Sequence, residues 1–181
     1  MILGETERSL SYLARKVRAL RDPDARAVAG LFGRRMVAEI LGDLESLRTT
    51  LAADFSYREF PRATDSSIGG VEDVVGRVKK MHERGSLAWV DWEHVVVDPQ
   101  GVGFSGVLRV ARRPGMAHRD RRPVLDVRYC VAGFVEVVGG VMVRESVVTA
   151  ETHRADTQMA NVGLGEMRRL ERWLGRFDPA R

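Results

Sequence analysis

The 181-residue chain is poor in several features, and each scarcity limits what the protein can be. Cys130 is its only cysteine, so no intramolecular disulfide can form and a reducing compartment, the cytoplasm, is expected. No apolar run approaches the roughly 20 residues that are needed to cross a bilayer. The first ten residues, MILGETERSL, lack the basic and apolar regions of a signal peptide. We therefore expect a cytoplasmic globular protein that has no membrane partner.

Lysine, isoleucine and asparagine are also scarce, and this affects how the net charge is interpreted. Only three of the 29 basic residues are lysines, and the formal net charge is +4. A basic protein is a candidate for binding nucleic acid or another polyanion. However, an excess of arginine together with three isoleucines and one asparagine is what codon usage in a GC-rich genome produces. The charge is therefore a weak argument for such a partner, and we expect no nucleic-acid binding.

The spacing of apolar residues in the first half of the chain predicts four helices. A stripe at intervals of three and four residues runs from Leu10 to Leu20. Asp22-Pro23 is typical of a helix start, because proline fits the first helical turn, and Gly42-Asp43 is typical of a break. The predicted helices cover residues 10–20, 24–41, 44–51 and 70–83.

After Gly85 the apolar period changes from about 3.6 to about 2, which indicates strands. The predicted strands cover residues 87–97, 103–112, 124–138 and 141–149. Turn residues separate them at 98–101 and 139–140, and a longer loop is predicted at 113–123. The pattern over residues 163–177 is again helical. Helices followed by a run of antiparallel strands predict an α+β domain.

Four segments of the chain carry a resemblance to a known family. They are ARKVRALRDPDARAVAGLF, ILGDLESLRTTLAADFSYREFP, GGVEDVVGRVKKMHE and VEVVGGVMVRESV. The chain resembles the SnoaL-like branch of the nuclear transport factor 2-like superfamily. The resemblance implies a cone-shaped fold, in which N-terminal helices pack inside a strongly curved antiparallel sheet around an apolar pocket. It also implies a homodimer formed through the outer face of the sheet. The expected division is an N-terminal helical extension (1–22), a SnoaL-like domain (23–152) and a C-terminal helical tail (153–181).

The segment DFSYREFP contains the first candidate site residues, Tyr57 and Glu59. It resembles the segment of limonene-epoxide hydrolases that binds water through a tyrosine and an asparagine, with Glu59 in place of the asparagine. Ketosteroid isomerases have a carboxylate base at about this position. Two residues that lie two apart on a strand share a face, and a phenol beside a carboxylate in an apolar pocket is a competent acid/base pair. The alternative is that Tyr57 is a core aromatic and Glu59 pairs with Arg58 or Arg62 at the rim.

Other positions depart from the patterns of the family. Arg109 resembles the arginine of the Arg-x-Asp pair of epoxide hydrolases, but Ala111 stands where the catalytic acid is expected. The dehydratase members carry a histidine where this chain has Asp91, and a tyrosine in the second helix where it has Arg35. These departures favour a ligand-binding or dimerising module that does not catalyse a reaction.

Three further carboxylates are candidates for the pocket. Asp91 lies on a strand next to tryptophans, where burial would raise its pKa, or it pairs with arginines on the solvent side. Asp126 shares a face with Arg128, which places it either inside the cone or in an exposed cross-strand ion pair. Glu145 corresponds by resemblance to a water-activating aspartate of the epoxide hydrolases. The glycine turn before its strand leaves its register open by one residue, which decides the face it occupies.

No metal or cofactor is expected, because the four histidines are scattered and no glycine-rich phosphate loop is present. The arginine-rich loop at 112–122 either binds an anion or is a solvated hairpin tip. The leading hypothesis is a small enzyme of the cyclase, isomerase, dehydratase or epoxide hydrolase type. It would act on a hydrophobic small molecule, with Arg109 and Asp91 or Asp126 completing the polar set. The convergence of Glu59, Asp91 and Asp126 in one apolar cavity separates this hypothesis from a non-catalytic binding module.

Overall fold

The computed structural model describes residues 2–60, 67–112, 124–157 and 173–177. Four helices are present in this part of the chain: α1 (Ile2–Ala19), α2 (Pro23–Leu41), α3 (Leu44–Thr49) and α4 (Val71–Glu83). The described strands are β1 (Leu51–Phe60), β2 (Ser67–Gly69), β3 (Leu87–Asp98), β4 (Gly101–Arg112), β5 (Val124–Val138) and β6 (Val141–Thr157). Strands β1 and β2 lie between α3 and α4 in the chain, and the other four follow α4. A 3-10 helix, η1 (Leu174–Phe177), follows. None of the described helices is long and apolar enough to cross a membrane.

Local chemistry sets the limits of α2 and α3. The Asp22 side chain caps the start of α2 by accepting hydrogen bonds from the backbone N–H groups of Asp24 and Ala25. At its end Gly42 takes the left-handed conformation, with φ at 71°. Asp43 then caps α3 by accepting a hydrogen bond from the N–H of Ser46. The predicted break between the two helices is therefore confirmed.

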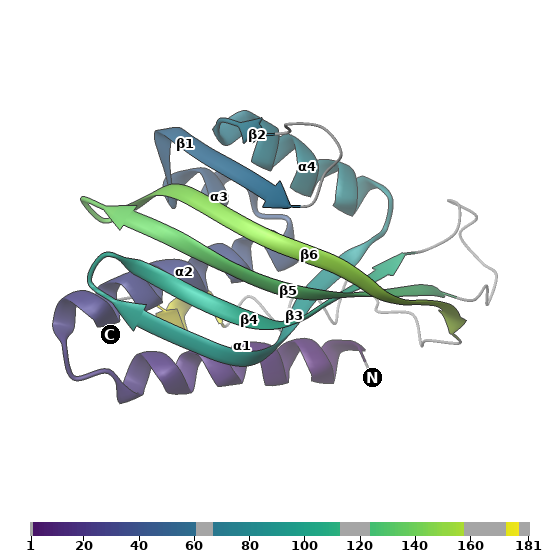
Figure 1. Cartoon of the computed structure of the whole chain (residues 1–181), viewed down its shortest axis with the longest axis horizontal. Helices are drawn as coiled ribbons and strands as arrows, with labels where there is room; N and C mark the ends of the chain where they lie inside the picture. Colours follow the sequence, from purple (N-terminus) through teal and green to yellow (C-terminus); the bar gives the residue numbers. More distant parts are fainter. Residues whose placement is uncertain (1, 61–66, 113–123, 158–172, 178–181) are drawn as a thin grey trace.

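The described strands form one open, six-stranded sheet in the order β2-β1-β6-β5-β4-β3 (Figure 1). All neighbours are antiparallel except β1 and β6, which are parallel. The expectation of a wholly antiparallel sheet is thus corrected: β1 leaves the helical region and enters beside the last strand, so the sheet is mixed. The predicted α+β cone is confirmed.

The last strand is longer than its sequence pattern indicated. β6 pairs with β5 as far as Thr157, beyond the expected boundary between the domain and its tail at 152/153. The predicted tail helix at 163–177 lies mostly outside the described residues, and its final part, Leu174–Phe177, is the 3-10 helix η1. The arginine-rich segment at 113–122 also lies outside the described residues.

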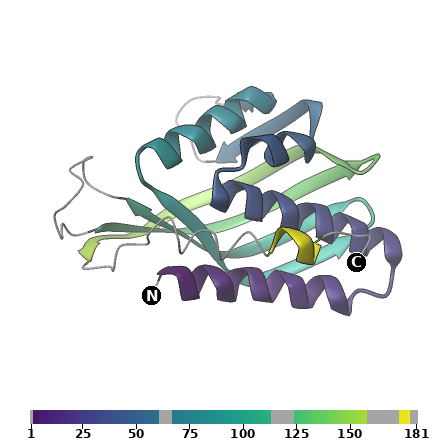
Figure 2. The ribbon, with the colours of Figure 1, turned by 180° about the vertical axis from the view of Figure 1, so that it is seen from behind.

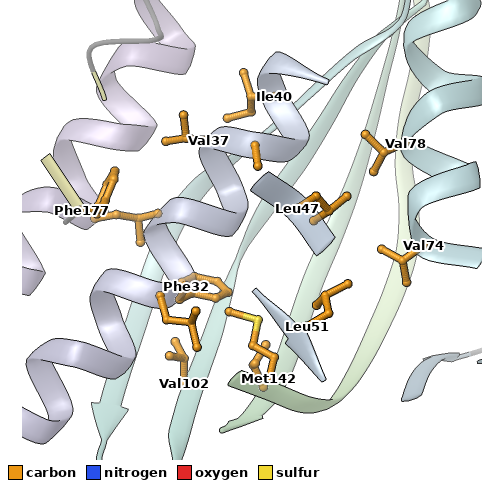
Figure 3. Packing of buried hydrophobic residues seen from close by; sticks show 14 of the residues in the cluster. Phe32, Val37, Ile40, Leu47, Leu51, Val74, Val78, Val102, Met142 and Phe177 are labelled. Atoms are coloured by element: carbon orange, nitrogen blue, oxygen red, sulfur yellow. The ribbon is translucent and has the colours of Figure 1, made fainter. Parts of the chain in front are cut away.

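The helices cover one face of the sheet. In Figure 2 α2 crosses in front of the strands, with α1 beside β3 at one edge and α4 beside β1 at the other. Val74 and Val78 of α4 project toward Leu47 of α3 in the core (Figure 3). Phe177 packs against α2, where a Cβ on Gly33 would overlap its ring. The sheet and the helices therefore share one hydrophobic core.

Candidate functional site

A pocket of about 1030 Å³ lies between α2, α4 and the concave face of the sheet. Its volume is at the upper end of the roughly 300–1,000 Å³ that is typical of small-molecule sites. Aliphatic side chains from both layers line much of its wall, among them Met36, Ile40, Leu108, Val110, Val131 and Val147. The pocket is therefore large and apolar enough to hold a hydrophobic molecule.

Three aromatic rings form one wall of the pocket. Phe32 of α2 and Phe104 of β4 each lie within 5.7 Å of Trp92, measured between ring centroids, and 5.6 Å from one another. Trp92 meets both rings edge to face, a favourable arrangement of aromatic quadrupoles. Gly133 on β5 is the partner of Phe104, and a Cβ there would lie 2.6 Å from the phenyl Cζ. The absence of a side chain at Gly133 therefore makes room for this aromatic wall.

The polar centre of the pocket is an arginine held between two glutamates. Arg35 of α2 donates from Nη2 to Oε2 of Glu145 at 2.5 Å, and from Nε to Oε1 of Glu39 at 2.9 Å. Its Nη1 also contacts Sδ of Met142 at 3.4 Å. The side chains of Arg35 and Glu145 are only 3% and 6% exposed, whereas that of Glu39 is 28% exposed. One guanidinium thus bridges a deeply buried carboxylate and a partly solvated one, and all three residues line the pocket.

Burial and charge act in opposite directions on this group. Burial opposes the charge of Arg35, but the two carboxylates outweigh it and raise its pKa above the usual value. Burial raises the pKa of Glu145, against the opposing effect of Arg35, and the negative charge of Glu39 raises it further. A carboxyl group in an apolar site, with its pKa raised by burial, is a candidate general base.

Tyr57 lies next to Glu145 because the two residues are register partners on the parallel strands β1 and β6. Its side chain is buried and faces the pocket. Burial raises the pKa of Tyr57 to about 12, although the nearby guanidinium of Arg77 lowers it. That guanidinium lies 5.1 Å from the centre of the tyrosine ring. The phenol is therefore neutral at physiological pH and available as a hydrogen-bond donor beside the Glu145 carboxyl.

Glu59 is placed beside this group rather than in its centre. Its Oε2 lies 3.5 Å from the Tyr57 hydroxyl and 3.5 Å from Nη1 of Arg77, and its Oε1 accepts a hydrogen bond from Thr149 at 3.0 Å. The predicted shared face of Tyr57 and Glu59 is present, since both side chains belong to this contact group. Glu59 does not line the pocket itself, so it acts on the site through Tyr57 and Arg77.

Arg109, Asp91 and Asp126 form a separate cluster. Arg109 contacts Glu5 of α1 at 2.6 Å, Asp126 at 3.2 Å and Asp91 at 3.9 Å. Asp126 also contacts Arg128 at 3.0 Å and is almost completely buried. This network links α1 to the sheet through charge-assisted hydrogen bonds. The expected convergence of Glu59, Asp91 and Asp126 in one cavity is therefore not found.

Strand alternation explains this separation. Leu108 and Val110 line the pocket, so the side chain of Arg109 between them points to the other face of β4. Asp126 pairs with Ala111, which shares the face of Arg109. None of Arg109, Asp91 and Asp126 lines the pocket that holds Glu145, so these three residues are not part of its polar centre.

The sequence-based search missed Arg35, Glu39 and Arg77 as site residues. The resemblance marks Arg35 only as the residue that replaces a tyrosine of the dehydratases. A signal was nevertheless present, because α2 is buried along most of its length and Arg35 has a glutamate four residues later. A charged residue in such a helix needs a partner, since arginine is almost never fully buried alone. The second partner, Glu145, is 110 residues away in the chain, and only the folded structure shows it.

No group of histidine, cysteine or carboxylate side chains among residues 2–60, 67–112, 124–157 and 173–177 is arranged to hold a metal ion. The polar groups of the pocket are instead suited to hydrogen bonding and proton transfer.

Comparison with known proteins reveals similarity in three dimensions only. No protein-family model matches the chain, and no curated protein matches its sequence. An LEH-like epoxide hydrolase from M. tuberculosis is 18% identical, with a TM-score of 0.55 over 68% of this chain and 82% of its own. A SnoaL-like polyketide cyclase candidate from Shewanella denitrificans is 12% identical, with a TM-score of 0.54 over 66% of this chain and 88% of its own. An Anabaena variabilis protein described as nuclear transport factor 2-like is 12% identical, with a TM-score of 0.54 over 77% and 96%.

This chain has the nuclear transport factor 2-like fold. The resemblance seen in the sequence is therefore confirmed at the level of the fold. In this chain the pocket lies inside the cone, between the helices and the concave face of the sheet. Its polar centre is the arrangement of Arg35, Glu39, Glu145 and Tyr57.

Proposed function

We propose that this protein is a cofactor-independent enzyme that performs acid/base chemistry on a hydrophobic small molecule. The observation that carries the proposal is the buried carboxyl group of Glu145, held by Arg35 and placed beside the Tyr57 hydroxyl in a large apolar pocket. Simple binding of an apolar molecule does not need a carboxyl, a guanidinium and a phenol at this position.

In the proposed mechanism Glu145 is the general base. It takes a proton from a carbon next to a carbonyl group, or from a water molecule that attacks the substrate. Negative charge then develops on a substrate oxygen, and the Tyr57 hydroxyl donates a hydrogen bond to it. Glu145 returns its proton to another atom of the substrate or to the leaving oxygen. Burial raises the pKa of Glu145, which makes its carboxylate a stronger base than an exposed glutamate.

Arg35 is a positioning residue in this mechanism. Its guanidinium fixes the orientation of the Glu145 carboxylate, and Glu39 fixes the guanidinium from the other side. Arg77 and Glu59 act in the same way on the ring and hydroxyl of Tyr57. Two solved structures with this fold bear the descriptions epoxide hydrolase and polyketide cyclase candidate. We place the reaction in the same range: isomerisation, ring closure, dehydration or water addition.

A ligand-binding module without catalysis is the second candidate function. The observation in its favour is that Arg35 and Glu145 already satisfy one another without a ligand. A buried pair of this kind can serve to specify the packing of the core rather than to catalyse a reaction. In this case the pocket retains its affinity for apolar molecules, but the Glu145 carboxyl transfers no proton.

Deuterium exchange separates the two functions without knowledge of the natural substrate. A bicyclic ketone is incubated with the protein in D₂O, and exchange at the carbon next to the carbonyl is followed by NMR. Hydrolysis of an alicyclic epoxide, followed by chromatography, tests water addition. Glu145→Gln should lower the rate of whichever of these two reactions the wild type catalyses by about 100-fold or more, as expected for loss of a general base. The matched control is Glu136→Gln, because Glu136 lies on the neighbouring strand β5 and pairs with exposed Arg144. Equal rates in the Glu145→Gln variant and the wild type contradict the proposal, and no exchange or hydrolysis by the wild type favours the binding module.

We also propose that the protein forms a homodimer through the outer face of its sheet. Large apolar side chains are exposed on this face: Phe134 of β5 is 47% exposed and Val148 of β6 is 55% exposed. Phe60 of β1 is the register partner of Val148 and is likewise exposed. Contiguous exposed apolar residues on a sheet are typical of an interface.

A further inference from the structure

We infer that the substrate of this pocket is an amphipathic acid, whose anionic group is held by Lys80 and Arg84 at the pocket mouth. The inference rests on the proposed function and names the class of molecule on which the site acts. The anionic group is a carboxylate or a phosphate, and the rest of the molecule is apolar. The basis is the distribution of paired and unpaired charges along α4.

Two basic residues of α4 and its C-cap residue, Arg84, border the pocket. Arg77, Lys80 and Arg84 all line the pocket, at intervals of three and four residues. Residues at these intervals are neighbours on a helix surface, with Cβ atoms about 5–6 Å apart. Lys80 and Arg84 are exposed, so they keep their hydration until a ligand arrives. Their side chains are long enough to converge on one small anionic group.

Most other charges around the pocket already have partners. Arg35 contacts Glu39 and Glu145, and Arg77 contacts Glu59 at 3.5 Å. Among the acidic residues of α4, Glu72 accepts two hydrogen bonds from Arg48, each of 2.9 Å, and Glu83 lies 3.8 Å from Lys79.

Within the part of the chain that the structure describes, neither Lys80 nor Arg84 forms an ion pair. The remaining acid of this lining is Asp73, in the first turn of α4, where it complements the positive end of the helix dipole. Eleven residues separate Asp73 from Arg84, which is about 16 Å along a helix. The two free cations therefore lie at one end of the pocket rim, away from the free carboxylate.

The interior of the pocket is apolar, in contrast to the charged rim at Lys80 and Arg84. The wall formed by Phe32, Trp92 and Phe104 offers apolar surface and no charge. A molecule with one anionic end and an apolar body satisfies both regions at once. Its charge stays at the solvated rim, where desolvation costs little, and its apolar body covers the aromatic wall. A neutral hydrophobic molecule would form no ion pair with Lys80 or Arg84.

The alternative is that Lys80 and Arg84 only stabilise the C-terminal end of α4, where basic residues complement the helix dipole. This alternative predicts an effect of their replacement on stability and none on ligand choice. A measurement of ligand binding therefore distinguishes the two interpretations.

The test compares two probes that have the same apolar chain, decanoate and 1-decanol. Each displaces the neutral fluorescent dye N-phenyl-1-naphthylamine from the full-length protein, and the displacement constants are compared. For the wild type we expect decanoate to bind about tenfold more tightly than decanol. The preference should shrink as sodium chloride is added, since exposed cations are screened by salt.

The decisive variant is the double substitution Lys80→Gln and Arg84→Gln. It should bind decanol as the wild type does and lose the preference for decanoate. The charge-conserving double variant, Lys80→Arg and Arg84→Lys, should keep the preference. Lys79→Gln is the matched control, because Lys79 is a neighbouring lysine that pairs with Glu83 and does not line the pocket.

Equal affinity of the wild type for the two probes, or failure of both to displace the dye, overturns the inference. So does a preference that survives in the glutamine double variant. The measurement is independent of turnover, which keeps the two proposals separate. Decanoate preference without proton transfer by Glu145 supports the anion site and contradicts the enzyme. Proton transfer by Glu145 without a preference for decanoate supports the enzyme and contradicts the anion site.

Discussion

Replacing Arg35 with methionine should destabilise the protein at neutral pH, because the Glu145 carboxylate then stays buried without its counter-charge. Arg35 contacts Glu145 at 2.5 Å, and only 6% of the Glu145 side chain is exposed. Breaking a buried ion pair by removing one partner costs about 3–5 kcal/mol. We therefore expect the free energy of unfolding to fall by about 3–5 kcal/mol near pH 7.5.

The loss should depend on pH in a defined direction. Burial and Glu39 raise the pKa of Glu145, while Arg35 lowers it, so the pKa rises further in the variant. A carboxyl whose pKa is higher in the folded than in the unfolded state stabilises the fold below its unfolded pKa of about 4.3. This stability is lost as the pH rises through the folded-state pKa, by at most about 1.4 kcal/mol per pH unit. The deficit of Arg35→Met should therefore be smaller at about pH 4.5 than at neutral pH.

Urea unfolding at these two pH values measures the effect. The double variant Arg35→Met/Glu145→Leu replaces both partners with apolar side chains and should recover most of the lost stability. Glu39→Gln is the matched control, and it should cost less than about 1 kcal/mol because Glu39 is partly exposed and can turn to solvent. The reasoning is refuted if Arg35→Met is as stable as the wild type at neutral pH. A deficit of the same size at both pH values refutes the assigned role of Glu145.

Three other substitutions test the packing and the outer face. In Gly33→Ala the new methyl group overlaps the Phe177 ring, so undocking of η1 should cost about 1–3 kcal/mol in urea unfolding; unchanged stability contradicts this contact. In Gly133→Ala the methyl lies 2.6 Å from Cζ of Phe104, so the aromatic wall should shift and weaken binding of N-phenyl-1-naphthylamine, whereas Gly103→Ala, whose Cβ meets nothing within 4 Å and which does not line the pocket, should not. Phe134→Lys on the outer face should convert a dimer to a monomer in light scattering; a wild-type protein that is itself monomeric contradicts the proposed interface.

The helices could be predicted because their limits depend on neighbouring residues. Asp22 caps α2 with its own side chain, and Gly42 ends it by adopting a conformation that other residues avoid. The strands after Gly85 were predicted from alternation for a similar reason. The parallel pairing of β1 with β6 could not be predicted in this way, because it joins segments that are about ninety residues apart.

In the candidate site, too, features set by neighbouring residues could be predicted, whereas the arrangement of distant segments could not. Alternation correctly predicted that Tyr57 and Glu59 share a face, and that Asp126 and Arg128 do. It did not predict which face of each strand lines the pocket, because both faces of β4 carry apolar residues. Arg109 is a candidate through its resemblance to the arginine of the epoxide hydrolases, but its neighbours Leu108 and Val110 line the pocket instead.

The sequence by itself determined the α+β class and the approximate positions of the four helices and of strands β3 to β6. These depend on periodicity, capping and turn residues, which act over a few positions. The resemblance to the SnoaL-like group added Tyr57 and Glu145 as candidates. The tertiary structure alone decided which charges meet. Arg35 lies four residues from Glu39 but needs the fold to bring Glu145 to its other side. A buried charge is stable only beside its partner, so the chemistry of the pocket is a property of contacts between distant strands and helices.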